Sequence, residues 1–433
     1  MRIGVRFMRI KRVIITGAGF SAPAKLPMQN QIIERMLEKN TPDFLSENEP
    51  RESLRFLKAY IRVGQFLLDS YGRNRYDSIR SEIATVEGAF AANPVLQKLL
   101  VDFSNGKIAV GAAALELINR RIVDSAAYFS ALSMLREKIR KALISEKINV
   151  NLEDIFTSFD KTTQSREYLQ HYTYQQMDEI RYSITCLFIY YLAKYTLEHN
   201  YANEDYLKFI RYIKTRGTKA PLTLITTNWD TLLEKYLQTG NVKYTFPIND
   251  HRLFDNLPPG IGNGRRVELI KMHGSIDWLR CLGCGSLQIC TTQDVSDFLF
   301  KDEVEQVCAR CHRSTKEFGM LLQPEIITPT MIKSFSSKLY RELWDAAETS
   351  LRDATHIIFI GYSLPIADFE FRYLLQKSVS DTAQIDVVLH HNDDPTQVTS
   401  TALKTLLPEK RYRDLFPRNK IQFFYDGFGK YFN

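Results

Sequence analysis

The stretch that most constrains the fold is Arg12–Ala22, RVIITGAGFSA, in which an apolar β-branched run passes directly into glycines. This composition predicts a buried strand that ends in a Gly-x-Gly turn before a helix. Such a turn lets backbone amides and the positive helix end face a pyrophosphate, although it also suits an ordinary strand-to-helix connection. A dehydrogenase fingerprint would place an acidic residue after a second strand about 20 residues later. Here Gln31–Lys39 is predicted to be helical instead.

The composition is typical of a soluble globular protein. Of the 433 residues, 44% are hydrophobic and 25% charged, and the net charge of +7 comes without a long run of one sign. We therefore infer no nucleic-acid surface. The basic start, Met1–Arg12, lacks the apolar core of a secretion signal, and Met8 is an alternative start. The apolar run Ile184–Ala193 is too short to cross a bilayer, so we predict a cytoplasmic protein with no membrane segment.

A change of pattern divides the chain. From Thr41 to about Arg216, apolar residues recur at helical spacing and strand-like alternation is scarce. We predict an α/β domain formed by residues 1–40 and 218–433, with a helical module inserted at 41–217. Within the module Asn151 precedes Glu153 and Asp154, which predicts a capped helix start. The predicted helices are Leu54–Ser70, Pro94–Phe103, Ala126–Ser145 and Tyr168–His199.

Polar residues follow two predicted strands of the second α/β part. The strand Leu222–Thr227 opens into Asn228 and Asp230, and the strand Glu268–Met272 is followed by His273. The carboxyl ends of strands are where open α/β sheets place their ligands. A lone histidine at a strand end is more often structural than catalytic, but the glycine and serine after His273 leave space for a substrate.

Further strands are predicted at His356–Ile360, Ile385–Leu389 and Ile421–Tyr425, and an amphipathic helix at Ser336–Arg352. The first of these strands ends in Gly361, with Ser363 two residues later, and Asp368 opens the helix that follows. The second ends in two adjacent histidines before Asn392. Adjacent side chains on a strand point to opposite faces, so these histidines do not suggest a metal site.

Four of the six cysteines form two Cys-x-x-Cys pairs, Cys281 with Cys284 and Cys308 with Cys311. Two such turns can complete a closed tetrahedral zinc site. With four sulfur ligands no position remains for an activated water, so the zinc is predicted to be structural, in a module at about 278–318. His312 and Cys290 are alternative ligands. Cys186 lies in an apolar helical pattern and is predicted to be buried.

These motifs occur in one order, and together they resemble the sirtuin family: the turn Gly17–Ser21, the sequence Thr226–Asp230, the run His273–Ser275, the paired cysteines and the turn Gly361–Ser363. The resemblance implies a Rossmann-like parallel sheet of sirtuin type, with a small zinc module, that binds NAD+ and cleaves the bond between nicotinamide and ribose. It covers Arg12–Ala22 and about Pro221–Asn392.

The resemblance also implies roles for single residues. Asn228 and Asp230 match positions near the nicotinamide ribose, and His273 matches the family's catalytic histidine, a general base on a ribose hydroxyl. The remaining implied NAD+-binding residues are Gly17, Ala18, Gly19, Phe20, Ser21 and Thr227, with Gly361, Ser363 and Asn392 on the adenosine side.

The chain departs from protein-deacylating sirtuins after the first glycines. These enzymes carry a Gly-Ile-Pro-Asp-Phe-Arg segment there, which helps to position the cofactor for reaction with an acyl-lysine, whereas this chain has Lys25–Asn30, KLPMQN. This departure, the turn Gly361–Ser363 and the helical insert are more similar to bacterial sirtuin-like NAD+ hydrolases of antiviral defence. That resemblance implies NAD+ hydrolysis in antiphage defence, a homo-oligomer and a partner such as a translocase-type ATPase. The alternatives are an NAD-dependent lysine deacylase and a non-catalytic protein that binds NAD+ or ADP-ribose.

Overall fold

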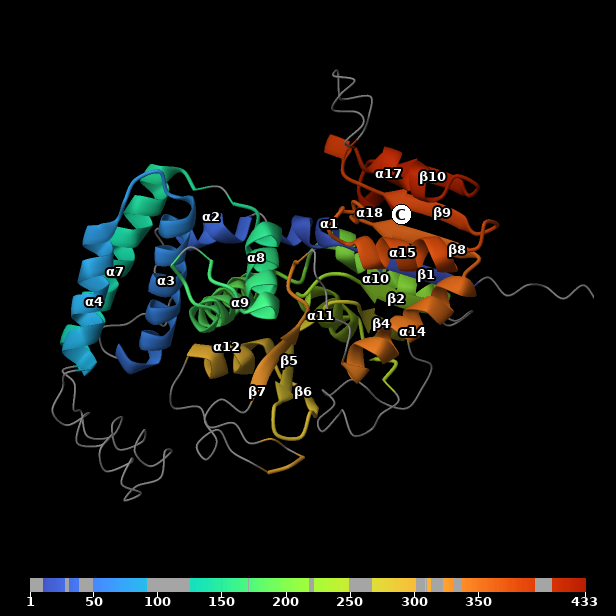
Figure 1. Cartoon of the computed structure of the whole chain (residues 1–433). Helices are drawn as coiled ribbons and strands as arrows, with labels where there is room; N and C mark the ends of the chain where they lie inside the picture. Colours follow the sequence, from blue (N-terminus) through green and yellow to red (C-terminus); the bar gives the residue numbers. More distant parts are fainter. Residues whose placement is uncertain are drawn as a thin grey trace, which may run out of the picture.

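The computed structural model describes residues 11–27, 31–38, 50–91, 125–148, 150–169, 171–217, 222–248, 267–300, 308, 310–312, 322–330, 337–393 and 407–433. In these ranges a parallel sheet with helices on both faces lies beside a group of helices, with a small antiparallel sheet between the two (Figure 1). None of the described helices is both long and apolar enough to cross a lipid bilayer.

The main sheet has seven strands in the order β10-β9-β8-β1-β2-β4-β3, and its described pairings are parallel. Chain order runs in opposite directions on the two sides of β1, so the carboxyl ends of β1 and β8 form a switch point. This topology confirms the predicted Rossmann-like sheet. Its strands are β1 (Arg12–Thr16), β2 (Leu222–Thr226), β3 (Tyr244–Thr245), β4 (Val267–Lys271), β8 (His356–Ile360), β9 (Gln384–Val388) and β10 (Lys420–Phe424).

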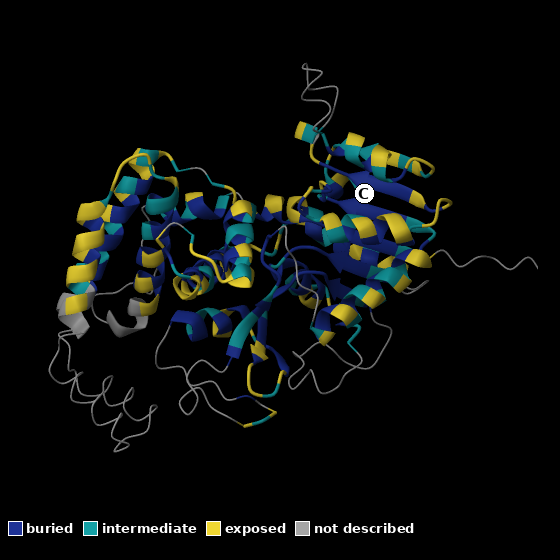
Figure 2. Ribbon diagram, in the orientation of Figure 1, coloured by how far each residue is buried: buried dark blue, intermediate teal, exposed yellow. Residues whose placement is uncertain are grey.

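The central strands are buried on both faces, which explains their nearly uninterrupted apolar sequences. One face is covered by α14 (Lys338–Arg352), α15 (Phe369–Ser378) and α17 (Pro408–Leu415). The other face is covered by α10 (Glu204–Gly217), α11 (Leu232–Thr239) and α18 (Phe428–Tyr431). Figure 2 shows the buried strands between helices whose exposed residues lie on their outer sides.

The second group of helices lies between β1 and β2 in sequence and packs around a second apolar core, separate from that of the main sheet. Its predicted helices are confirmed as α3, α7 and α9, while Pro94–Phe103 lies outside the described residues. Asn151 caps α8, since its Oδ1 accepts from the Glu153 amide at 3.0 Å. The elements are α2 (Ile32–Leu37), α3 (Pro50–Tyr71), α4 (Asp77–Ala91), α7 (Ser125–Glu146), α8 (Leu152–Ser165) and α9 (Tyr174–Glu198).

The domain boundaries themselves stay a prediction. The buried residues of α10 belong to the core of the main sheet, although α10 lies within the predicted module 41–217. The Tyr206 hydroxyl of α10 donates to the Phe20 carbonyl at 2.6 Å. Conversely, Ile32, Ile33 and Met36 of α2 belong to the core of the helical group.

A small antiparallel sheet of order β6-β5-β7 follows β4. Its strands are β5 (Gly274–Cys281), β6 (Leu287–Ile289) and β7 (Leu322–Ile326), and α12 (Thr292–Phe300) packs against β5. The sheet continues directly from His273, and its β5 ends at Cys281. It therefore connects the polar end of β4 to the paired cysteines.

Candidate active site

The glycines at the switch point bring two turns into direct contact. The Gly17 amide donates to the Ile360 carbonyl at 3.0 Å, and the Gly19 amide donates to the Gly361 carbonyl at 2.8 Å. A Cβ added at Gly19 would lie 2.7 Å from the Gly361 Cα, and Gly361 has a positive φ of 58°. The backbone amides of such a turn can face a pyrophosphate, but these two donate to protein carbonyls. The glycines are therefore needed for close packing of the turns.

The short helix α1 (Ala18–Ser21) begins in this turn and leads into the 3₁₀ turn η1 (Ala22–Ala24). Phe20 points into the core, where its ring meets Tyr206 at 5.1 Å and Phe209 at 5.3 Å between centroids. Ala18 and Gly19 are exposed. Phe20 thus anchors α1, while Ala18 and Gly19 form its accessible side.

Asn228 lies at the centre of a buried hydrogen-bond network beneath α1. Its Nδ2 donates to the Gly17 carbonyl at 2.9 Å and to the Ser21 Oγ at 3.0 Å. The Ser21 hydroxyl donates in turn to the Asp230 Oδ2 at 2.8 Å. All three side chains are buried. The structure therefore joins predicted residues that follow β1 to predicted residues that follow β2, although they are far apart in sequence.

A lysine inside the fold supports this network. Lys271 is fully buried at the end of β4. Its Nζ donates to the carbonyl oxygen of Asp230, which follows β2, and to the carboxylate of Glu234 in α11. Burial raises the pKa of Asp230 and Asp277, and it raises the pKa of Glu234 to about 7, in each case against the opposing charge of Lys271. The buried carboxyl groups of Asp230 and Glu234 and the half-buried carboxyl group of Asp277 thus lie in the field of one buried ammonium group, and burial favours retention of a proton among them.

His273 lies on the neighbouring strand end and is only 3% exposed. Its Nδ1 is 3.1 Å from the Thr227 carbonyl oxygen, and the Trp229 ring stacks on it with 5.8 Å between centroids. The Trp229 indole donates to the Ile327 carbonyl at 2.8 Å, which fixes the stacked ring. On the other side the Asp368 Oδ1 lies 3.6 Å from the His273 Nε2.

Two residues of this arrangement were missed as functional candidates. These are Trp229, which follows β2, and Asp368, which was predicted only as the start of the helix after β8. Nothing local to either residue indicates that both contact His273. Two predicted residues lie apart from the buried network. Ser363 is exposed and its carbonyl accepts from the Arg411 Nε at 2.8 Å, and Asn392 is exposed in the 3₁₀ turn η4 (His391–Asp393).

The four paired cysteines meet as predicted. Their Sγ atoms all lie within 4.8 Å of one another. The Cys281 and Cys311 sulfurs are 3.8 Å apart, and those of Cys284 and Cys308 are 3.6 Å apart. Four sulfurs held about 2.3 Å from a tetrahedral zinc would be about 3.8 Å apart. The cluster therefore fits a structural zinc site, held at the end of β5. Cys186 is buried, as predicted.

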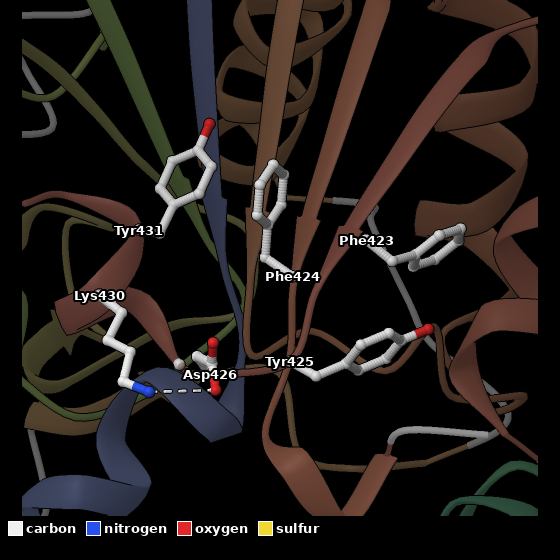
Figure 3. Close-up of a pocket in the computed structure, with 7 residues that line it drawn as sticks. Phe423, Phe424, Tyr425, Asp426, Lys430 and Tyr431 are labelled. Carbon is white, nitrogen blue, oxygen red and sulfur yellow. Dashed lines mark ion pairs between the residues drawn. The ribbon is translucent and has the colours of Figure 1, made fainter. Parts of the chain in front are cut away.

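A cavity of about 500 Å³ lies at the carboxyl end of β10, at the edge of the main sheet. Figure 3 shows the rings of Phe424 and Tyr431 near each other, and the ion pair between Asp426 and Lys430 among the other lining residues. Its lining contains none of the predicted site residues. The candidate active site is instead the buried group of Asn228, Ser21, Asp230 and His273 at the central strand ends.

Residues 222–407 match the sequence model of the SIR2-like domain family, and this range includes Asn228, His273 and the four paired cysteines. No curated protein matches the chain. A solved chain from work on the structural basis of sirtuin substrate affinity is similar, with 13% identity, a TM-score of 0.31, and coverage of 87% of this chain and 81% of that one. A chain from work on the mechanism and regulation of Sir2 enzymes has 12% identity, a TM-score of 0.33, and coverage of 98% and 90%. The family match therefore assigns a SIR2-like domain to residues 222–407.

Proposed function

We propose that this protein is a sirtuin-like NAD+ hydrolase, which cleaves the nicotinamide–ribose bond and releases nicotinamide and ADP-ribose. One observation carries the proposal: Asn228, Ser21 and Asp230 form a buried network beside His273, where β1, β2 and β4 end. The SIR2-like match over the second α/β part supports NAD+ as the substrate.

In the proposed reaction the bond between the ribose C1′ and the nicotinamide nitrogen breaks, and its electron pair leaves with nicotinamide. A water oxygen then bonds to C1′ and the water loses one proton. Asn228 positions the ribose or the water, and His273 accepts a proton from a ribose hydroxyl. The ribose oxygen regains a proton from the attacking water, and His273 passes the remaining proton to solvent. The reaction thus consumes one NAD+ and one water and yields nicotinamide, ADP-ribose and one proton.

The other predicted contacts belong to the same proposal. Residues 17–21 and Thr227 hold the phosphates and ribose, and Gly361, Ser363 and Asn392 border the adenosine. Since the amides of Gly17 and Gly19 already donate to carbonyls, we expect the exposed side of α1, around Ala18, to meet the phosphates. Zinc at the four cysteines is structural and keeps β5 in place after His273.

Water is preferred over an acyl-lysine as the second reactant because the Asp-Phe-Arg element is missing. Residues Lys25–Asn30 replace that segment and contain no acidic residue or arginine. By analogy with defence hydrolases, the activity depletes NAD+ in antiphage defence, in the cytoplasm, within a homo-oligomer and with a translocase-type ATPase as partner.

The test measures nicotinamide release by the purified full-length chain and by two variants. His273→Ala should lower the rate by about 10²-fold or more, the usual scale for loss of a general base. Asn228→Ala should lower it comparably, since it removes the donor of the network. Matched controls are His171→Ala and Asn74→Ala, which remove exposed side chains of the helical group. Parental turnover by folded Asn228→Ala and His273→Ala proteins would reject these roles.

A further inference from the structure

The orientation of His273 determines which of its nitrogens can take up a proton. The Nδ1 lies 3.1 Å from the Thr227 carbonyl oxygen. Because a carbonyl only accepts, Nδ1 must carry the hydrogen of this bond. The neutral ring then has its lone pair on Nε2. Any proton that His273 accepts must therefore arrive at Nε2.

A carboxylate lies beside that nitrogen. The Asp368 Oδ1 is 3.6 Å from the His273 Nε2, and both side chains are shielded from solvent, with 3% of His273 and 13% of Asp368 exposed. Asp368 directly precedes α15, so it reaches His273 from the β8 side of the sheet. A second group holds it, since the Tyr362 hydroxyl donates to the Asp368 Oδ2 at 3.1 Å.

We propose that Asp368 is a further positioning residue of the proposed hydrolysis, which stabilises the protonated form of His273 and is itself held in place by Tyr362. The inference rests on the proposed function. When a ribose hydroxyl gives up its proton, the O–H bond breaks and an N–H bond forms at Nε2. The resulting imidazolium then faces a carboxylate that stays ionised. An opposite charge at this distance favours the charged form by about 1–3 pKa units.

The surroundings support this assignment. Burial, together with the neighbouring Asp368 charge, raises the pKa of Tyr362 well above its ordinary value, so its hydroxyl stays neutral and donates. Trp229 and Thr227, which also contact the ring, carry no charge. Arg372, one turn into α15, opposes the raised pKa of Tyr362 but is outweighed by burial. The pair of Tyr362 and Asp368 thus forms a fixed acceptor next to Nε2.

The first test does not depend on turnover. The titration of His273 is followed by NMR in ligand-free protein labelled with ¹⁵N-histidine. The chain has eight histidines, and the His273 signal is identified as the one that is lost in His273→Gln. Asp368→Asn should lower the titration midpoint of His273 by about one unit or more. Asp426→Asn, which removes an exposed carboxylate at another strand end, should leave it unchanged. An unchanged midpoint in Asp368→Asn would overturn the inference.

The second test uses NAD+ turnover across pH. In Asp368→Asn the rate of nicotinamide release should begin to rise at lower pH and should reach a lower plateau. Asp368→Glu should restore part of that plateau. Tyr362→Phe should have a smaller effect than Asp368→Asn. Faster nicotinamide release by Asp368→Asn would show instead that Asp368 blocks the site, and would overturn the inference. If the parental protein releases no nicotinamide while the His273 midpoint still shifts, the proposed function fails and the contact stands.

Discussion

Gly361→Ala tests the close packing of the two turns at the switch point. The residue has a φ of +58°, and a Cβ there would lie 2.3 Å from the Gly19 carbonyl carbon and 2.4 Å from the Phe20 nitrogen. The positive φ costs an alanine about 1–2 kcal/mol. Because the clashing atoms are backbone, overpacking adds about 1–3 kcal/mol. We therefore expect Gly361→Ala to lower the free energy of unfolding by about 2–5 kcal/mol.

Gly285→Ala provides the matched control. Gly285 also has a positive φ, of 74°, but a Cβ there meets no atom within 4 Å. Its expected cost is the backbone part alone, about 1–2 kcal/mol. At an unfolding entropy of about 2.1 cal/mol/K per residue, each kcal/mol shifts the Tm of this 433-residue chain by about 1 °C. Gly361→Ala should therefore melt at least about 1 °C below Gly285→Ala. Equal melting of the two variants would refute the contact between the turns.

Three further predictions concern stability and metal content. Cys308→Ser should abolish bound zinc, measured by elemental analysis, whereas Cys290→Ser should retain it; equal zinc in both would reject the four-cysteine site. Lys271→Met should lower the free energy of unfolding by about 3–5 kcal/mol, because it leaves buried Glu234 without its partner. Denaturant unfolding measures this change. The control Lys410→Met, which removes one side of an exposed ion pair, should change the free energy of unfolding by less than about 0.5 kcal/mol. Asp386 is buried and would otherwise have a raised pKa, but hydrogen bonds from His356, Tyr431 and Gln384 outweigh burial and lower it. It therefore stabilises the fold above its unfolded pKa of about 3.9, and this is lost as pH falls through the lower folded value. Asp386→Asn should thus lose stability at pH 7 and show a weaker acid dependence below about pH 4; an unchanged acid profile would contradict this.

Much of the fold was predictable because its signals are local. Strands buried on both faces require continuous apolar runs, and the predicted strand His356–Ile360 agrees with β8 at both ends. The cap at Asn151 is equally local, since one side chain meets an amide two residues later. The paired cysteines have a spacing that few other functions require.

The antiparallel sheet was harder to predict. Seven of the eight residues of β5 are not exposed, so its sequence lacks the alternation that marks a half-buried strand.

The missed parts of the site depend on contacts between distant turns. Nothing near Gly17 or Gly19 indicates that their amides donate to carbonyls of residues 360 and 361. Likewise, Asp368 has the local pattern of a helix start, and its contact with His273 exists only once β4 and β8 lie in one sheet.

The most direct test of the proposed function is nicotinamide release from NAD+ by the purified full-length chain, with and without an acetyl-lysine peptide. The proposal predicts release of nicotinamide and ADP-ribose in equal amounts without peptide, and no increase when peptide is added. Release that requires the peptide and yields a deacylated lysine would contradict it and establish a deacylase. Tight NAD+ binding without nicotinamide release, in either condition, would identify a non-catalytic binding protein.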